Sequence, residues 1–281
     1  MSPDYIVLGA MKCGTTTLAA QLGAQDGIFM TDPKEPNYFS DDAVYAKGPD
    51  WYRALFHAAA PGDLKGEAST HYTKRPELPD TVARMTSAVA QVRLVYMIRN
   101  PMARLVSHYI HEWSQGVLSR PLEVELEAHS PLVDYGRYGW QITPFVEAYG
   151  RDAILLTSLE RWKQDGQAEL ARVAAHIGFQ GEVALASDDA ENVSAARPRK
   201  LPMHGLLVDN PVSDALRRTL VPKAVRTWVR EARQMKGRPV IPEGRKAGLE
   251  ARFAEDREIL ARVFPGDPSL DLAYPFLKAP R

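Results

Sequence analysis

The chain has 281 residues, of which 45% are hydrophobic and 25% are charged. This length accommodates one large α/β domain or two small ones, with ample apolar content for a core. Lysine plus arginine and aspartate plus glutamate each number 35, so the formal net charge is zero. A general nucleic-acid binder usually carries a basic surplus that neutralises phosphates, so the sequence argues against that class.

The N-terminus and the cysteine content predict a cytoplasmic protein without an integral membrane segment. The first residues, MSPDYIVLGAMKCG, lack a basic region and contain too short an apolar run for a signal peptide. No apolar run of the sequence approaches the length that spans a bilayer. Cys13 is the single cysteine, so no intrachain disulfide is possible, which fits a reducing compartment.

The first part of the chain predicts a strand, a helix, a loop and a second helix in turn. Residues 5–8 form a short apolar run with β-branched side chains that ends at Gly9, which is typical of a buried strand. Residues 15–22 predict a helix, because their leucines lie four residues apart. Residues 31–41 are rich in turn formers and predict a loop, and residues 50–59 again predict a helix.

Two further strands and two further helices follow. Residues 92–98 and 153–157 are apolar runs that predict strands. Pro101 is expected to open a helix after the first of them, since proline is well tolerated at the first helical position. Residues 168–177 predict an amphipathic helix. Strands that alternate with helices indicate βαβ units, and hence a mainly parallel sheet covered on both faces.

The C-terminal third predicts a loop and two helices. Residues 196–212 are punctuated by prolines, and residues 215–235 and 243–263 have helical patterns. The outer face of the helix at 215–235 is basic. Such a face suits an anionic acceptor or a membrane surface, although a solvated helix face is the simpler explanation. We predict a single α/β domain over residues 1–281, with a central mainly parallel sheet flanked by helices and residues 215–281 as a helical cover.

The sequence GAMKCGTT at residues 9–16 lies between a predicted strand and a predicted helix. Its glycines match the frame G-x-x-x-x-G-K-[ST] of nucleotide-binding loops, but Thr15 occupies the lysine position and Lys12 lies three residues earlier. Backbone N–H groups of such a loop still face an anion at the helix N-terminus. Arg99 and Asn100 follow the next strand where a metal-binding carboxylate would stand, so we expect no metal and an anionic donor bound without Mg²⁺.

The stretch YIVLGAMKCGTTTLAAQL resembles the 5′-phosphosulfate loop of sulfotransferases that use 3′-phosphoadenylyl sulfate (PAPS). It is most similar to bacterial members related to the heparan sulfate and Golgi-type enzymes. Other elements of the family are matched, in the same order, by KEPNYF at 34–39, GEASTHY at 66–72, IRNPMARLVSHY at 98–109, ENVSAARPR at 191–199 and the late FAEDREILARVF. The resemblance covers nearly the whole chain. It implies a P-loop-like phosphosulfate-binding loop, PAPS as co-substrate and 3′-phosphoadenosine 5′-phosphate (PAP) as product.

The resemblance also implies which residues bind the donor. Lys12 would reach the bridging oxygen and the leaving phosphate, and backbone N–H groups and hydroxyls at the start of the following helix would hold the 5′-phosphate. Arg99 and Ser107, eight residues apart, would bind the 3′-phosphate, and the late loop would close over it. The full expected set is Lys12, Gly14, Thr15, Thr16, Thr17, Arg99, Ser107, Arg197 and Arg199.

The expected catalytic residues are Lys12 and Glu35. Glu35 stands in the family's K-E-x-[HN]-[FY]-F element and is the candidate general base, with Lys34 beside it helping to keep it ionised. Glu67 and His71 form a second polar cluster that is expected to contact the acceptor. His71 remains an alternative base, since cytosolic relatives use histidine.

The predicted reaction is in-line transfer of a sulfuryl group from PAPS to a hydroxyl or amine of a small-molecule or carbohydrate-like acceptor. Ala68 stands where heparan enzymes often have lysine, and Thr70 and His71 replace a common Pro-x pair, so a heparan-type polysaccharide is disfavoured. Two alternatives remain: a P-loop nucleotide-dependent kinase or NTPase, and a non-catalytic adenylate- or carbohydrate-binding module. The sequence predicts neither the acceptor's identity nor the oligomeric state.

Overall fold

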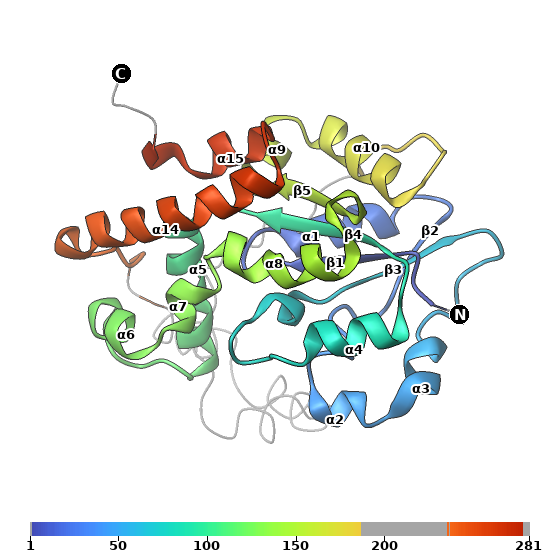
Figure 1. The fold of residues 1–281 in the computed structure, drawn as a ribbon, viewed down its shortest axis with the longest axis horizontal. Helices are drawn as coiled ribbons and strands as arrows, with labels where there is room; N and C mark the ends of the chain where they lie inside the picture. The colour runs from blue at the N-terminus through green and yellow to red at the C-terminus, as the bar shows by residue number, and fades with distance from the viewer. Residues whose placement is uncertain (1, 187–234, 236, 278–281) are drawn as a thin grey trace, which may run out of the picture.

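The strands form a parallel sheet with the first strand at its centre. The computed structural model describes residues 2–186, 235 and 237–277. The strands pair in the order β2-β3-β1-β4-β5, and each pairing is parallel. Their bounds are β1 Tyr5–Gly9, β2 Ile28–Met30, β3 Leu64–Ala68, β4 Arg93–Ile98 and β5 Ile154–Ser158. The carboxyl ends of all five strands therefore meet at the same edge of the sheet (Figure 1).

Helices surround this sheet and lie between most of its strands in the chain (Figure 1). Their bounds are α1 Thr15–Gly23, α2 Asp42–Tyr45, α3 Gly48–Ala54, α4 Thr81–Ala88, α5 Pro101–Gln115, α6 Leu122–Ala128, α7 Pro131–Asp134, α8 Tyr138–Tyr149, α9 Leu159–Gln164, α10 Gly166–Ile177, α14 Glu243–Val263 and α15 Pro268–Ala273. Short 3-10 turns lie at Thr70–Thr73 (η1), Arg151–Ala153 (η2) and Pro275–Leu277 (η4).

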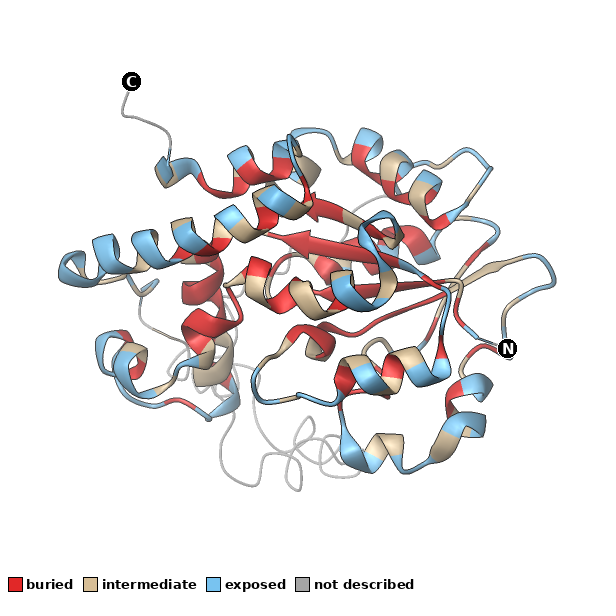
Figure 2. Ribbon diagram, viewed as in Figure 1, coloured by how far each residue is buried: buried red, intermediate tan, exposed pale blue. Residues whose placement is uncertain are grey.

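Alternating side chains of the central strands build two separate cores. Tyr5 and Val7 of β1 pack with apolar residues of α1 and α10 on one face of the sheet. Ile6 and Leu8 of the same strand pack with α5, α8 and α14 on the other face. The strands are consequently buried on both sides, as Figure 2 shows. Continuous apolar runs are expected for such strands, because neither face of the sheet meets water.

The connections after β1 and β4 create a crevice at the carboxyl edge. These strands are neighbours in the sheet. The helix after β1, α1, joins the core on one face, whereas the helix after β4, α5, joins the core on the other. Neighbouring strands whose helices go to opposite faces leave a crevice outside their carboxyl ends, and open α/β sheets bind ligands there. The loop at residues 9–14 and Arg99 both stand at this point.

The predicted fold class is confirmed: a single α/β domain with a parallel sheet flanked by helices. The strands predicted at 5–8, 92–98 and 153–157 correspond to β1, β4 and β5, and α14 has the bounds predicted for the final helix, 243–263, although the short helix α15 follows it. The helix predicted at 50–59 corresponds to α3, which ends earlier, at Ala54, and begins earlier, at Gly48, where a proline occupies its first turn. The loop and helix predicted at 196–212 and 215–235 lie outside the described residues, except for residue 235.

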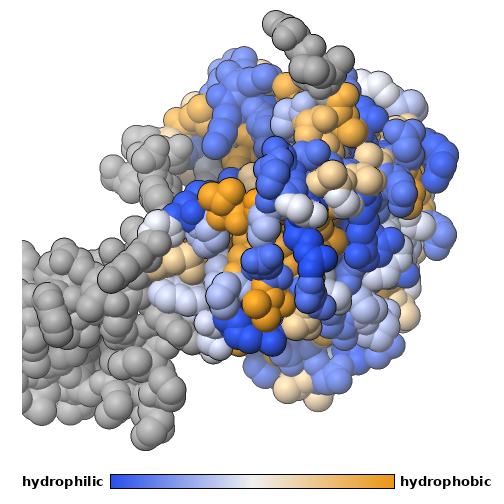
Figure 3. Space-filling view, turned by 90° about the vertical axis from the view of Figure 1, so that its left-hand side faces the viewer, coloured by the Kyte–Doolittle hydropathy of each residue, from blue (hydrophilic) through white to orange (hydrophobic). Residues whose placement is uncertain are grey.

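The surface of the described residues is largely polar. Figure 3 shows one face, on which hydrophobic side chains form separate small areas among hydrophilic ones. The large hydrophobic side chains that are exposed come from several segments of the chain: Val117, Val124, Leu185, Val240 and Leu277. Scattered apolar residues of this kind are normal for a folded protein surface. No described helix combines the length and apolar character needed to cross a membrane.

Candidate active site

The loop between β1 and α1 brings backbone N–H groups to the carboxyl edge of the sheet. Gly14 precedes α1 with φ 97°, a left-handed conformation that strains any residue with a side chain, and a Cβ atom there would lie 2.9 Å from Leu159 Cδ1. Lys12 also has a left-handed backbone, with φ 67°. Gly14 offers no side chain that could cap α1, and the first turn of α1 carries no acidic residue. This N-terminus can therefore direct N–H groups and partial positive charge towards an anion.

Arg99 and Tyr138 hold the loop from the β4 side. The Nη1 atom of Arg99 donates a hydrogen bond to the carbonyl oxygen of Lys12 at 3.3 Å. The Tyr138 hydroxyl donates to the Arg99 carbonyl oxygen at 2.8 Å and lies 3.4 Å from the sulfur of Cys13. Cys13 is fully buried, and burial raises the pKa of its thiol to about 11, so it is not a reactive nucleophile. The structure therefore brings Lys12 and Arg99 together.

The remaining expected donor-binding residues differ in their exposure. Of the three threonines that open α1, Thr15 is buried, Thr16 is exposed and Thr17 is half-buried. Ser107 is buried in α5, the helix that begins two residues after Arg99. Their contact with a donor stays a prediction. The expected contributions of Arg197 and Arg199 lie outside the described residues.

Glu35 is held in place at the end of β3. Its backbone N–H donates to the carbonyl oxygen of Ala68 at 3.0 Å. Its Oε1 atom accepts hydrogen bonds from Lys34 Nζ at 2.7 Å and from Thr70 Oγ1 at 3.2 Å. Glu35 has φ 62°, a left-handed conformation that is uncommon for a residue with a side chain and is enriched at functional sites.

The carboxylate of Glu35 is poised to remain ionised. Burial acts to raise its pKa, but the charge and hydrogen bond of Lys34, together with His71 and Thr70, bring the pKa below the usual value. This contact agrees with the expectation that Lys34 favours the ionised form. His71 lies close enough for the two groups to influence each other. The pKa of His71 is lowered by burial and by the neighbouring charge of Lys74, so His71 is neutral near pH 7.

Glu67 does not occupy the position that the sequence suggested. It is 0% exposed and accepts hydrogen bonds from the hydroxyls of Tyr52 at 3.0 Å, Ser69 at 2.7 Å and Tyr72 at 2.6 Å. Burial raises the pKa of its carboxyl group. A side chain enclosed in this way has no access to an acceptor, so the expected direct contact is wrong for this conformation. Glu67 instead joins α3, β3 and η1 below the site.

The substitution Glu67→Ala is expected to lower the free energy of unfolding by about 3 kcal/mol, because it leaves several buried hydroxyl donors without an acceptor. Urea denaturation measures this change. The matched variant Tyr52→Phe removes one donor and keeps the carboxylate, so its cost is expected to be about 1 kcal/mol. A Glu67→Ala protein as stable as the wild type would show that these hydrogen bonds do not support the fold.

Three residues near the site were not included in the set predicted from the sequence: Thr70, Lys74 and Tyr138. Thr70 binds Glu35, and Lys74 is a largely buried cation whose pKa is lowered by burial. Tyr138 braces the loop from a helix far along the chain. Tyr138 stands in the stretch YGRYGW. The sequence alone did not single it out, because an aromatic residue in such a stretch more often packs in the core than lines a site. Only the tertiary contact with Arg99 reveals its role.

Comparison with known proteins agrees with this geometry. The sulfotransferase domain family matches residues 2–217 of the chain. The membrane-associated sulfotransferase kil1 of Dictyostelium discoideum is 32% identical over 130 residues, which is 44% of this chain and 26% of that protein. Heparan sulfate glucosamine 3-O-sulfotransferase 3B1 of Mus musculus is 27% identical over 191 residues, which is 63% of this chain and 46% of that protein. The chain thus spans less than half the length of either relative.

Solved structures share the fold. A sulfotransferase from Alicyclobacillus acidocaldarius superposes with a TM-score of 0.65 at 20% identity, covering 96% of this chain and 98% of that one. Mouse sulfotransferase SULT7A1, solved in complex with PAP, superposes with a TM-score of 0.51 at 16% identity, covering 96% and 87% of the two chains. Because the family match includes well over half of the residues, the chain belongs to the sulfotransferase domain family.

Proposed function

We propose that this protein transfers a sulfuryl group from PAPS to a hydroxyl or amine of a small-molecule or carbohydrate-like acceptor. The observation that carries the proposal is the meeting of the Lys12 loop, Arg99 and Glu35 at one edge of the sheet in a chain of the sulfotransferase family. PAP bound to the mouse structural neighbour supports the choice of donor. We further propose that residues 1–281 act as one sulfotransferase domain.

In this proposal the loop and Arg99 bind the donor. The N–H groups at the start of α1 and the hydroxyls of Thr15, Thr16 and Thr17 hold the 5′-phosphate, while Arg99 and Ser107 hold the 3′-phosphate. Lys12 neutralises the charge that develops on the leaving phosphate oxygen as the bond from sulfur to that oxygen breaks. Fixed donors directed at developing charge are an effective source of catalysis.

Glu35 acts on the acceptor side. The acceptor oxygen or nitrogen forms a bond to sulfur in line with the leaving oxygen, and its proton passes to the carboxylate of Glu35. The ionised state that Lys34 and Thr70 favour is the one that accepts a proton. His71 remains the alternative base, because it lies beside Glu35 and is neutral near pH 7.

The kinase alternative has no support from the residues around the loop. Asn100 follows β4, and its side chain accepts hydrogen bonds from the N–H groups of Met102 and Ala103 as the N-cap of α5. The position after this strand is therefore used to begin a helix. The family match likewise favours sulfuryl transfer.

The donor assignment is tested by the preference for a 3′-phosphate. PAP is expected to bind at least tenfold more tightly than adenosine 5′-phosphate, and Arg99→Ala is expected to weaken PAP binding about ten- to a hundredfold, because a charge-assisted hydrogen bond contributes about 1.5–3 kcal/mol. Isothermal titration calorimetry measures both differences. Equal affinity for the two nucleotides would overturn the assignment of PAPS as the donor.

A further inference from the structure

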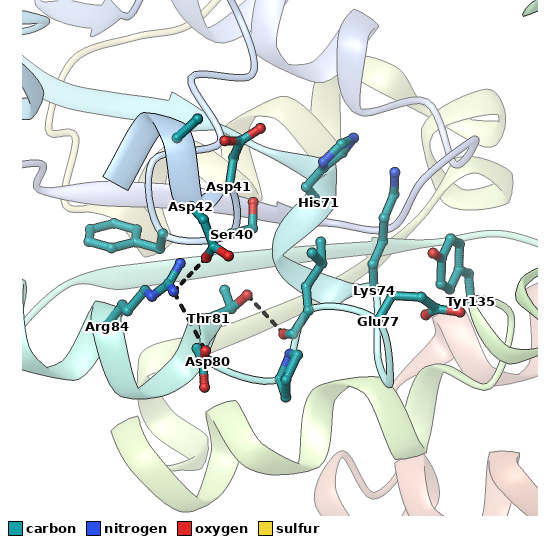
Figure 4. A pocket seen from close by; sticks show the side chains of 14 residues that line it. Ser40, Asp41, Asp42, His71, Lys74, Glu77, Asp80, Thr81, Arg84 and Tyr135 are labelled. Carbon is teal, nitrogen blue, oxygen red and sulfur yellow. Dashed lines mark hydrogen bonds and ion pairs between the residues drawn. The ribbon is translucent and has the colours of Figure 1, made fainter. Parts of the chain in front are cut away.

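A cavity of about 500 Å³ is lined in part by the η1 turn, whose residue Thr70 hydrogen-bonds the proposed base Glu35. It is formed by the segment before α2, the start of α2, the η1 turn and the region leading into α4. His71 and Lys74 contribute to its wall, and Figure 4 shows their side chains extending in the same direction. The η1 turn rests on β1, since Thr73 Oγ1 donates to the Leu8 carbonyl oxygen at 3.3 Å. The same turn links the cavity to Glu35, because Thr70, the neighbour of His71, donates to Glu35 Oε1 at 3.2 Å.

Carboxylates outnumber cations among the described residues that line this cavity. The carboxylates are Asp41, Asp42, Glu77 and Asp80, and the cations are Lys74 and Arg84. Arg84 is already paired, at 2.6 Å from Asp42 and 3.5 Å from Asp80, as the dashed lines in Figure 4 mark. His71 adds no charge near pH 7, because its pKa is lowered. The lining is thus net negative, and it repels a ligand rich in carboxylate or sulfate groups.

We infer that this cavity is the acceptor site and that it selects an uncharged or cationic hydroxyl compound over an anionic one. The inference rests on the proposed sulfuryl transfer and deepens it by naming the acceptor's class. The inferred acceptor differs in charge from heparan sulfate, the polyanion named for the mouse 3-O-sulfotransferase 3B1. A volume of about 500 Å³ suits a ligand of one or two rings. The carboxylates then act as specificity determinants, attracting amines and hydroxyl donors.

The test uses two series of acceptors that differ mainly in charge. Tyramine, tyrosol and 4-hydroxyphenylacetate share a phenol, and glucosamine, glucose and glucuronate share a sugar ring. Transfer of ³⁵S from labelled PAPS at low ionic strength gives kcat/KM for each. The cationic or neutral member of a series is expected to exceed the anionic member by about threefold to tenfold, the effect of one or two nearby charges.

A charge reversal within the lining sharpens this test. Glu77 is exposed and lines the cavity, so Glu77→Lys is expected to reduce or invert the preference against anions. Glu147 is exposed on α8 outside the lining, so Glu147→Lys makes the same change in net charge and should leave the preference unaltered.

Two outcomes would overturn the acceptor assignment. One is a preference for the anionic members that Glu77→Lys does not change. The other is turnover of none of the six compounds by protein that binds PAP. Failure to bind PAP would instead reject the proposed function itself, so the two failures can be told apart.

A second inference concerns Arg104, which lies in α5 between Arg99 and Ser107. Its side chain is 0% exposed. Nη2 donates to the carbonyl oxygen of Leu132, Nη1 lies 3.4 Å from His108 Nδ1, and Nε has no hydrogen-bond partner. The pKa of His108 is lowered to about 3 by burial, so this partner is neutral. The other ring nitrogen of His108 lies 3.4 Å from Glu112 Oε1, so this carboxylate meets Arg104 only through the imidazole ring. No ion pair joins Arg104 to a carboxylate within the described part of the chain.

A buried cation without an anionic partner is costly to maintain, and proteins usually pair such a charge. Arg104 lies within electrostatic reach of Cys13, inside the phosphate loop. The geometry points to Arg104 as a positioning residue of the donor site, whose missing counter-charge arrives with the phosphates of the donor. It lies in the first turns of α5, where its N–H donates to the carbonyl oxygen of Asn100, the residue directly after Arg99, at 2.8 Å, and it acts on the anion through space.

The variant Arg104→Met separates this role from a merely structural one. PAP affinity is expected to fall about tenfold, whereas the unliganded protein keeps its melting temperature to within a few degrees, because a buried charge replaced by an apolar chain of similar volume is often neutral for stability. Calorimetry with PAP and thermal unfolding without ligand measure the two effects. Arg93→Met removes an exposed arginine at the start of β4, at the opposite edge, and should leave PAP affinity unchanged.

Arg104→Lys keeps the charge but changes the hydrogen bonds, and it should retain PAP affinity to within about threefold. If Arg104→Met fails to fold, the PAP affinity of Arg104→Lys still tests the inference. Unchanged PAP affinity in Arg104→Met, or a lysine variant that binds PAP at least tenfold more weakly than the wild type, would overturn the inference. Wild-type protein that does not bind PAP would instead reject the donor assignment.

Discussion

Lys12→Ala is expected to lower kcat by about a hundred- to a thousandfold while changing KM for PAPS by only a few-fold. Negative charge on the leaving phosphate oxygen grows as the bond to sulfur breaks, so a cation placed there stabilises the transition state more than the bound donor. Lys12 is suited to this role, because it lies in the loop between β1 and α1 and its backbone is fixed by Arg99. Steady-state kinetics with saturating acceptor measure the effect.

A second lysine supplies the control for this experiment. Lys65 stands in β3 and pairs with Asp4 at 3.0 Å, near the amino edge of the sheet. Lys65→Ala also removes one positive charge, and its kcat should remain close to that of the wild type. If Lys12→Ala raises only KM, Lys12 binds donor and transition state equally and has no specific part in the chemical step.

The central part of the fold could be predicted because its local signals and its packing agree. β1, β4 and β5 are continuous apolar runs that end in polar or turn residues, and the sheet buries them on both faces. β3 is different. Its sequence, LKGEA, contains a lysine, a glycine and a glutamate, which do not indicate a strand.

Tertiary contacts explain why β3 nevertheless forms. A Cβ atom at Gly66 would lie 2.0 Å from the ring of Tyr5, so the glycine admits this ring against the strand. The carboxylate of Glu67 is satisfied by three hydroxyls from other segments. These partners come from α3 and from residues after the strand. Ser69 and Tyr72 stand in the GEASTHY segment itself, but the burial of Glu67 and its contact with Tyr52 depend on tertiary packing, and this burial explains why Glu67 was wrongly expected at the acceptor.

The candidate site likewise contains residues that the sequence indicates and residues that only tertiary contacts bring into place. Lys12, Arg99 and Glu35 stand in motifs that follow strands, and the carboxyl ends of parallel strands meet at one edge, so their proximity could be anticipated. The contribution of Tyr138 could not be anticipated, because its partner Arg99 lies 39 residues away in the sequence. Their contact depends on how α8 packs beside β4. Sequence motifs thus predicted the residues at strand ends, whereas the side chains that support them required the structure.

Glu35→Gln is expected to lower kcat by about a hundredfold or more with PAP affinity near that of the wild type. The amide keeps the shape of the side chain and can still accept from Thr70 Oγ1, but it cannot take a proton from the acceptor. Glu147→Gln, on the exposed face of α8, is the matched control and should be fully active. Rapid-quench kinetics and calorimetry with PAP separate the chemical step from donor binding.

The pH dependence of the wild type adds an independent measurement. The pKa of Glu35 lies below its usual value, so the carboxylate is ionised above that pKa, and the rate should fall only when the pH drops through it. If His71 were the base, the rate would instead follow the lowered pKa of His71, and the acidic fall would remain in Glu35→Gln. Normal turnover and an unchanged acidic fall in Glu35→Gln, with no turnover in His71→Ala, would assign the proton to His71 and contradict the role of Glu35.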